Sequence, residues 1–242
     1  LMLVPFRSAI EACAAVNAIM LAGITPSALE FMERDALELA MRYTNTSTIQ
    51  LPDDVKAHLL VEVDGNNLDV LYKEIELITE VLNNFDTGEI LFADSHEQKQ
   101  MLWALRRKVG EAVKSHSIYK EEDTVVPRAA LPELLSIVKR IGAVYGFTSV
   151  CYGHAGDGNL HVNIIKGKMR DDDWNNKLPL AIRELFTETV RLGGTLSGEH
   201  GIGLVQKGYM DIAFNQVQLS LMKSIKNIFD PNGILNPGKV FP

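Results

Sequence analysis

Apolar residues follow two different patterns along this chain. Residues 57–65 form a mostly apolar run that ends at a turn, and in residues 68–82 the apolar positions recur at helical spacing. A short apolar run bounded by turn residues indicates a buried strand, whereas recurrence every three to four positions indicates an amphipathic helix. This part of the chain is therefore predicted to be a strand followed by a helix.

The rest of the chain repeats this alternation. Further strands are predicted at residues 89–93, 118–126, 148–152 and 160–165, and further helices at residues 95–114, 131–145, 172–192 and 215–229. Residues 5–43 are interpreted as two helices with a break near residues 23–26. Strands interleaved with helices, including a tight hairpin, favour an α+β domain in which helices cover one face of an antiparallel sheet. We find no dinucleotide-binding glycine motif, no P-loop lysine and no internal repeat.

Composition limits the classes of function. The chain has 242 residues, of which 46% are apolar and 23% are charged, so it can fold around a substantial core as one or two domains. Its net charge of −7 disfavours nucleic acid and anionic membranes as partners, so an anionic substrate must be attracted by local cations or a metal. Cys13 and Cys151 cannot form a disulfide framework and are expected to be core residues.

The apolar start of the chain does not predict a membrane span. It is interrupted by Pro5 and is far shorter than the roughly 20 apolar residues that cross a bilayer. No basic segment precedes it, so a secretory signal is not predicted and a cytoplasmic location is expected. Because the sequence begins at Leu1 rather than at a methionine, we expect it to be a domain of a longer protein.

The most informative stretch is Tyr-Gly-His-Ala-Gly-Asp-Gly-Asn-Leu-His-Val-Asn at residues 152–163. A hairpin loop made of the Asp-Gly pair would place His154 directly opposite His161. Directly opposed side chains have Cβ atoms about 4.5–5.5 Å apart, which allows both imidazoles to reach one cation. Strand alternation adds Asn163 to the same face, where it can hydrogen-bond a metal-bound ligand. Two histidines near a turn are otherwise typical of a surface, so the opposed register is what favours a site.

A second cluster, at residues 193–203, contains five glycines around Glu199 and His200. Glu199 can complete a metal site of two histidines and one carboxylate, which leaves coordination positions open for substrate. The ordinary pKa of histidine lies near neutrality, as a general base requires, and this suits His200 beside the metal. Two other functions stay open on these residues: a stand-alone metal-dependent hydrolase, and a non-catalytic binding domain.

Four motifs resemble one family. Residues 153–161 and the run Ser-Gly-Glu-His-Gly at residues 197–201 closely resemble signatures of the C-terminal domain of FAD-linked oxidases. The run Ala-Leu-Glu-Phe-Met at residues 28–32 and the run Phe-Asp-Pro-Asn-Gly-Ile-Leu-Asn-Pro-Gly-Lys at residues 229–239 are similar to its early and terminal segments. Members include glycolate oxidase flavoprotein subunits, D-lactate dehydrogenases and D-2-hydroxyglutarate dehydrogenases. The resemblance covers nearly the whole chain.

The resemblance implies a domain and a ligand set. Residues 1–242 would form a ferredoxin-like cap domain that binds substrate and metal, while an N-terminal FAD-binding domain outside this chain holds most of the FAD. His154, His161 and Glu199 match the ligands of a divalent metal, which we expect to be zinc or manganese. Asn163 and His200 match substrate contacts, with His200 as the catalytic base.

The same resemblance assigns Arg106 and Lys120 to the substrate carboxylate. A guanidinium binds a carboxylate bidentately, so Arg106 is the better anchor, although a basic run on a helix is also typical of a solvated face. Gly110 stands where some 2-hydroxyglutarate-type relatives carry a substrate-contacting threonine, which argues against a long dicarboxylic substrate. Asn236 and Lys239 match a terminal segment that lies against the flavin, and the alternative is a turn that ends the chain.

The expected function is therefore that of the substrate-binding domain of a flavin-dependent 2-hydroxy-acid dehydrogenase. It would oxidise D-lactate, glycolate or a similar substrate to a 2-oxo acid by hydride transfer to FAD. An electron acceptor such as an iron-sulfur protein is a further expected partner, and it would place the protein at the membrane periphery. Without the FAD-binding domain, this chain is expected to be inactive.

Overall fold

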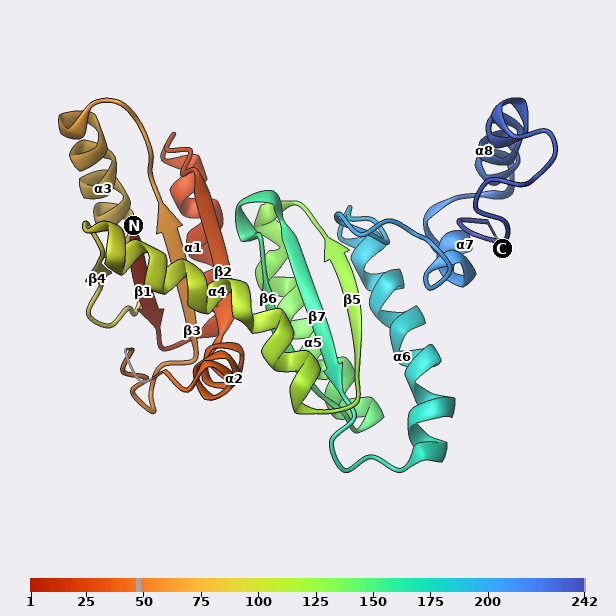
Figure 1. Ribbon diagram of the computed structural model, residues 1–242, viewed down its shortest axis with the longest axis horizontal. Helices are drawn as coiled ribbons and strands as arrows, with labels where there is room; N and C mark the ends of the chain where they lie inside the picture. The colour runs from red at the N-terminus through yellow and green to blue at the C-terminus, as the bar shows by residue number, and fades with distance from the viewer. Residues whose placement is uncertain (47–48, 242) are drawn as a thin grey trace.

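The computed structural model describes residues 1–46 and 49–241. These residues form a seven-stranded sheet in which all neighbouring strands are antiparallel, in the order β4-β1-β3-β2-β6-β7-β5 (Figure 1). The strands are β1 (Met2–Phe6), β2 (Ala28–Glu33), β3 (Ala57–Glu62), β4 (Leu91–Phe92), β5 (Tyr119–Val125), β6 (Thr148–Gly153) and β7 (Asn159–Ile165). The α+β class and the antiparallel sheet expected from the sequence are confirmed.

Helices cover both faces of this sheet rather than the single face expected. Helices α2 and α4 pack on one face, while α1, α3, α5 and α6 pack on the other (Figure 1). The helices are α1 (Ala9–Leu21), α2 (Arg34–Thr44), α3 (Leu68–Leu82), α4 (His96–His116), α5 (Leu131–Tyr145), α6 (Asp171–Arg191), α7 (Met210–Ala213) and α8 (Gln216–Phe229).

The sheet is built from two similar halves. The elements β1-α1-β2-β3-α3-β4 with strand order β4-β1-β3-β2 make a ferredoxin-like unit, and α2 is inserted between β2 and β3. The elements β5-α5-β6-β7-α6 repeat the first five of these, and β2 pairs with β6 where the halves meet. The sequence shows no repeat, because the halves share an arrangement of elements rather than a pattern of residues.

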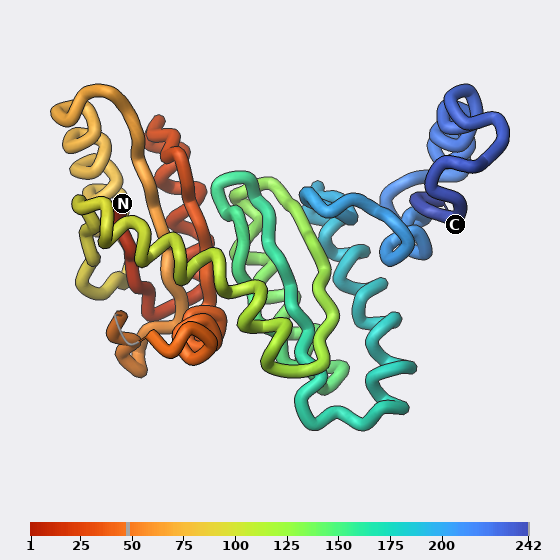
Figure 2. Tube along the Cα trace, viewed as in Figure 1, coloured from red at the N-terminus to blue at the C-terminus, as the bar shows by residue number. Residues whose placement is uncertain are grey.

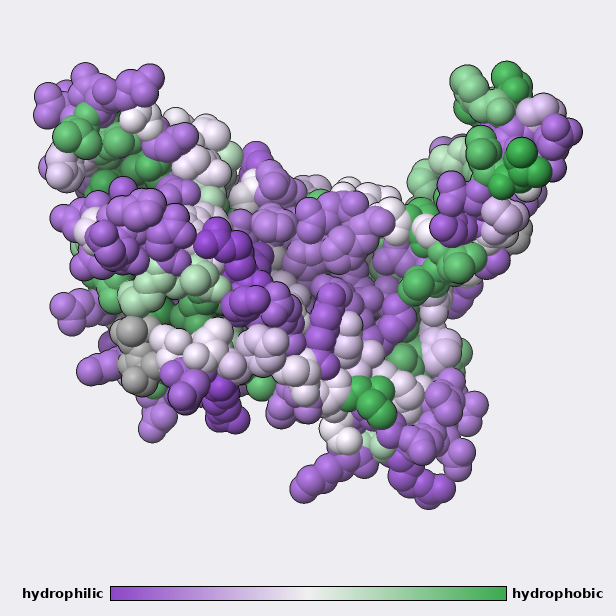
Figure 3. Space-filling view, in the orientation of Figure 1, coloured by the Kyte–Doolittle hydropathy of each residue, from purple (hydrophilic) through white to green (hydrophobic). Residues whose placement is uncertain are grey.

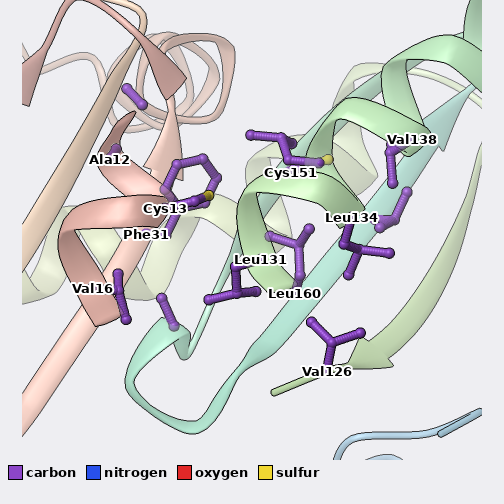
Figure 4. Close-up of a cluster of buried hydrophobic side chains, with 14 of the residues drawn as sticks. Ala12, Cys13, Val16, Phe31, Val126, Leu131, Leu134, Val138, Cys151 and Leu160 are labelled. Atoms are coloured by element: carbon purple, nitrogen blue, oxygen red, sulfur yellow. The ribbon is translucent and has the colours of Figure 1, made fainter. Parts of the chain in front are cut away.

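Each face of the sheet has its own apolar core. The larger core includes Phe31, Leu160, Cys13 and Cys151, and it joins the sheet to α1, α5 and α6 (Figure 4). Both cysteines are buried and free, as the sequence predicted. The smaller core joins the sheet to α2 and α4. This smaller core lies on the face that carries the polar site.

The prediction of two helices in residues 5–43 is wrong at residues 5–6, which end the unpredicted strand β1. It is also wrong at residues 28–33, which form β2. This segment consists mostly of good helix formers, including Leu29, Glu30 and Met32, so its local propensity favours a helix. In the fold it pairs with β3 along its full length and with β6 at one end. Burial between these two neighbours outweighs the local preference.

Helix α8 and the residues after it extend away from the sheet, as the chain trace shows (Figure 2). One side of α8 exposes a stripe of apolar side chains, which appears as green patches in the space-filling view (Figure 3). The stripe comprises Val217, Leu221, Ile225, Ile228 and Phe229. Among residues 1–46 and 49–241, no helix combines the length and the apolar character needed to cross a bilayer.

Candidate metal and substrate site

Polar side chains gather on one face of the sheet where β7 lies between β6 and β5. The β5–β7 register places Asp123 opposite His161 and Glu121 opposite Asn163. From β6, Tyr152 pairs with His161, and the two ring centroids lie 5.3 Å apart. Paired residues project to the same side of a sheet, so these five side chains share one surface, which we call the site face.

The connection between β6 and β7 is not the two-residue hairpin expected from the sequence. A short 3-10 helix, η2 (Ala155–Asp157), precedes β7, so His161 pairs with Tyr152 instead of His154. The backbone N–H groups of Asp157 and Asn159 both donate to the carbonyl of His154, which closes a helical turn. Gly158 has a φ of +77°, and a Cβ there would lie 2.0 Å from a backbone carbonyl oxygen of the neighbouring strand segment. The predicted register was therefore wrong by two positions.

The three predicted metal ligands nevertheless converge. The ring centroids of His154 and His161 lie 5.8 Å apart. Glu199 Oε1 lies 3.7 Å from His154 Nε2 and 3.4 Å from His161 Nε2. One ligand atom from each residue lies within 4.8 Å of the other two. This spacing is compatible with a cation about 2.0–2.2 Å from each donor.

His154 is held by Glu30, a buried residue of β2. His154 Nδ1 lies 2.8 Å from Glu30 Oε1, and Arg106 donates from Nε and Nη2 to Glu30 Oε2 at 2.9 and 2.7 Å. Burial acts to raise the pKa of Glu30, but the His154 hydrogen bond and the Arg106 charge outweigh burial and hold that pKa below its usual range. A histidine bound through Nδ1 to a carboxylate presents Nε2 to a metal.

The pKa values of the two histidines move in opposite directions. The hydrogen bond to Glu30 raises the pKa of His154. Burial lowers the pKa of His161 to about 4. Because only a neutral imidazole binds a metal, the lowered pKa of His161 favours metal binding, whereas the raised pKa of His154 makes a proton a stronger competitor for that ring.

The loop of residues 197–201 brings His200 beside His161. The two rings stack with centroids 5.2 Å apart and planes 14° apart. The His200 side chain is 48% exposed, and its Nε2 lies 3.8 Å from Glu199 Oε1. Asp123, which is buried beneath this loop, accepts hydrogen bonds from the backbone N–H groups of Glu199 and His200. Burial acts to raise the pKa of Asp123, but these hydrogen bonds outweigh it and hold the pKa below its usual range.

A second donor set overlaps the first. Glu121, His161 and His200 also bring three ligand atoms within 4.8 Å of one another. Both sets use His161, so they describe alternative positions of one cation rather than two independent sites. Substituting Glu199 alone or Glu121 alone would show which position the cation occupies, because each carboxylate belongs to one set only.

The two side chains predicted to bind the substrate carboxylate, Arg106 and Lys120, lie in different places in the structure. Arg106 on α4 is 8% exposed, contacts Glu30, and lies over the Tyr152 ring with its Cζ 5.2 Å from the ring centroid. Lys120 projects from the opposite face of β5, where its Nζ lies 2.8 Å from Oε1 of the fully buried Glu122. Neighbouring residues of a strand alternate between faces. The structure therefore brings Arg106 to the site and does not bring Lys120 there.

The other predicted residues lie in two places. Asn163 is buried, and both polar atoms of its amide lack a hydrogen-bond partner among the described residues. An unpaired buried polar group costs about 1–3 kcal/mol, so the site has unused hydrogen-bonding capacity here. Asn236 and Lys239 are exposed in the C-terminal segment, where Lys239 Nζ donates to Asn236 Oδ1 at 2.9 Å. This segment contacts the chain after the 197–201 loop through Val240 N–H and Gly203 O.

Two buried carboxylates of the site, Glu30 and Asp123, were not predicted from the sequence. A carboxylate inside an apolar strand signals a buried partner, but the local pattern around Glu30 predicts a helix, in which a carboxylate carries no such signal. Asp123 follows Glu121 and Glu122, and such an acidic run is typical of a solvated edge. Alternation along the predicted strand at residues 118–126 is the signal that separates Asp123 from Glu122.

The chain is similar in sequence to a known family of flavoprotein domains. The profile of the family described as FAD linked oxidases, C-terminal domain, matches residues 1–240. A D-lactate dehydrogenase of Anaerostipes hadrus is 30% identical over 243 residues, which cover 99% of this chain and 51% of that protein. The glycolate oxidase subunit GlcD of Bacillus subtilis is 33% identical over 229 residues, which cover 93% of this chain and 47% of that protein. The chain thus spans about half the length of these relatives.

The fold is also found among solved structures. The 4-ethylphenol oxidase of Gulosibacter chungangensis, in its isoeugenol complex, matches with a TM-score of 0.67 over 99% of this chain and 53% of that chain. Sequence identity in this match is 15%. At that identity the similarity concerns the fold alone.

Proposed function

Since this chain belongs to the family of C-terminal domains of FAD linked oxidases, as its four motifs indicated, we propose that it forms the substrate- and metal-binding half of a flavin-dependent 2-hydroxy-acid dehydrogenase. The observation that carries the proposal is the convergence of His154, His161 and Glu199 beside the half-exposed ring of His200. The relatives named D-lactate dehydrogenase and glycolate oxidase subunit support a small 2-hydroxy acid as substrate.

The donor set fits a divalent cation. Two imidazole nitrogens and one carboxylate oxygen suit zinc and manganese, and three protein ligands leave positions open for a substrate. Bound there, the cation would act as a Lewis acid that lowers the pKa of the substrate hydroxyl. Glu30 binds His154 Nδ1 and so orients this ligand before a cation is bound.

His200 is the residue that we propose as the general base. Its Nδ1 lies 3.9 Å from Asp123 Oδ2 and its Nε2 lies 3.8 Å from Glu199 Oε1, so Nε2 faces the ligand set. In this arrangement Nε2 accepts the proton of the substrate hydroxyl.

The substrate carboxylate has two candidate partners. Arg106 directs Nε and Nη2 to Glu30, so its remaining nitrogen, Nη1, is the donor that we assign to the carboxylate. Asn163 has an unpaired amide on the same face and can donate to a substrate oxygen. Together they orient the α-carbon for oxidation. Lys120 has no part in this proposal because it lies on the other face of the sheet.

A flavin-binding half completes the proposed enzyme. FAD would accept the two electrons removed from the α-carbon. The exposed apolar stripe of α8 supports contact with a further domain, since contiguous exposed apolar patches mark interaction surfaces. We place Asn236 and Lys239, on the segment that follows this helix, beside the flavin. The cytoplasmic location and an electron-acceptor protein stay predictions.

The test uses the full-length protein that contains this chain. D-Lactate and glycolate are offered with a dye acceptor, and flavin reduction in a single turnover is followed by absorbance. We expect His200→Ala to slow flavin reduction by at least about 100-fold, as loss of a general base does, with metal content unchanged. His96→Ala serves as the control, because His96 lies at the exposed start of α4.

Two results would contradict the proposal. Flavin reduction at the normal rate in His200→Ala would remove the assigned base. Failure of every 2-hydroxy acid to reduce the flavin, together with metal-dependent ester or amide hydrolysis, would favour the hydrolase alternative.

A further inference from the structure

Asp123 is a buried carboxylate to which the proposed reaction assigns no step. It lies on β5, is 1% exposed, and projects onto the site face opposite His161. Its Oδ1 lies 3.7 Å from His161 Nδ1. A buried ionised group is costly unless several donors satisfy it, so its partners indicate its role.

The partners of Asp123 come mainly from the loop that carries Glu199 and His200. Asp123 Oδ2 accepts the backbone N–H of Glu199 at 2.7 Å and that of His200 at 2.8 Å. Ser197 Oγ donates to the same oxygen at 3.1 Å and accepts the backbone N–H of Gly201 at 2.8 Å. One carboxylate oxygen thus gathers three donors from the five residues of the loop.

Asp123 also binds β7 through its other carboxylate oxygen, and it binds the loop again through its backbone carbonyl. Asn159 Nδ2 donates to Asp123 Oδ1 at 2.7 Å, and the backbone N–H of Gly198 donates to the carbonyl of Asp123 at 3.2 Å. The loop is pressed closely onto these groups, since a Cβ on Gly198 would lie 1.8 Å from Asn159 Nδ2. Such contacts fix the loop position relative to β7, which carries His161.

We infer that Asp123 is a positioning residue, which aims Glu199 at the metal and His200 at the substrate by holding the peptide groups of both residues. The inference rests on the proposed function, because it assigns Asp123 a role through the ligand and the base proposed there. Two adjacent N–H groups bound to one oxygen fix the rotation of the backbone at both residues. Charge-assisted hydrogen bonds of this kind are about twice as strong as neutral ones.

The matched pair of variants is Asp123→Asn and Glu122→Gln. Both replace a buried carboxylate of β5 with an amide of the same size, but Glu122 projects to the opposite face and contacts Lys120. An asparagine at position 123 keeps the volume but removes the charge that strengthens the hydrogen bonds of the loop. Its amide nitrogen meets a donor in either orientation, either Asn159 Nδ2 or the N–H groups of the loop. We therefore expect only Asp123→Asn to free the loop.

The first measurement is amide hydrogen exchange at Glu199 and His200 in metal-free full-length protein. We expect Asp123→Asn to speed exchange at both amides by about tenfold or more, and Glu122→Gln to leave them unchanged. Unchanged exchange in Asp123→Asn would overturn the inference. If that variant does not fold, Ser197→Ala replaces it, because it removes one of the three donors that fix Asp123 Oδ2. Faster exchange is then expected at Glu199 and His200, and unchanged rates at both amides would contradict the inference.

The second measurement is Mn²⁺ affinity by calorimetric titration. We expect Asp123→Asn to weaken Mn²⁺ binding by about 10–100-fold, as loss of a group that orients a ligand does. If Asp123 acts through Glu199, the double variant Asp123→Asn with Glu199→Gln binds no more weakly than Glu199→Gln alone. Additive losses in the double variant would overturn the inference. Absence of Mn²⁺ and Zn²⁺ binding in the unaltered protein would contradict the proposed metal site, while the exchange measurement would still decide the role of Asp123.

Discussion

His154 Nδ1 lies 2.8 Å from Oε1 of Glu30, and the other oxygen of that carboxylate binds Arg106. One buried acid therefore orients a predicted metal ligand and neutralises a predicted substrate cation. The two residues are 124 positions apart in the sequence. Their contact depends on the pairing of β2 with β6, which also joins the two halves of the sheet.

We expect Glu30→Gln to lower the free energy of unfolding by about 3 kcal/mol, because it leaves the buried guanidinium of Arg106 without a counter-charge. The double variant Glu30→Gln with Arg106→Met removes both charges and should recover most of that loss. Urea unfolding of the metal-free proteins measures both values. A double variant less stable than Glu30→Gln would contradict this account of the pair.

A second prediction concerns Lys120, which the resemblance assigned to substrate. Lys120→Met should lower the free energy of unfolding by about 2 kcal/mol, since Glu122 is fully buried and loses its counter-charge. The KM for the 2-hydroxy acid should stay within about twofold of normal, because Lys120 faces away from the site. Steady-state kinetics of the full-length protein and urea unfolding measure the two effects. A tenfold rise in KM with unchanged stability would show instead that Lys120 contacts the substrate.

The elements with a clear period were predictable from the sequence. Helices α3 and α5 begin and end where the pattern placed them, and β3, β5, β6 and β7 agree within about three residues. Strand β2 was missed because its residues favour a helix locally, and only its place between β3 and β6 makes it a strand. Local pattern carries no information on such pairing.

The candidate site was predictable in its residue types but not in its support. Histidine, carboxylate and glycine clusters identified His154, His161 and Glu199, and the fold brings them together. Glu30 and Asp123 reach them from strands far away in the sequence, so no spacing rule indicates the contacts. The hairpin register failed for a similar reason, since the helical turn at η2 packs against segments outside the hairpin.

A third prediction tests the close packing of the 197–201 loop. Gly198→Ala should weaken Mn²⁺ binding at least tenfold, because the added Cβ would lie 2.8 Å from Asp123 Oδ1 and still closer to Asn159. Gly208→Ala is the control, since a Cβ there meets nothing within 4 Å and its φ is not in the left-handed region. Calorimetric titration measures both affinities. Equal affinities in the two variants would show that the loop adapts without loss of the ligand geometry.

The last prediction concerns His58 of β3, whose imidazole is buried at 2% exposure and whose Nδ1 has no hydrogen-bond partner among the described residues. Burial, and then the charge of Arg34, lower its pKa to about 4. In the unfolded chain the pKa of histidine is about 6.5. Between these two values the unfolded chain binds the proton more readily, so stability falls as the pH decreases from about 6.5 to about 4.

His58→Leu removes this titration. At about 1.4 kcal/mol for each pH unit, the unaltered protein should lose about 2 kcal/mol more than the variant between pH 7 and pH 4.5. Urea unfolding of the metal-free proteins at a series of pH values measures the difference, in which carboxylates and His161 cancel because both proteins contain them. At pH 7 the variant should be at least as stable as the unaltered protein, since it replaces an unpaired buried polar group with an apolar one. Parallel stability curves for the two proteins would mean that His58 takes up its proton equally well in the folded and unfolded states.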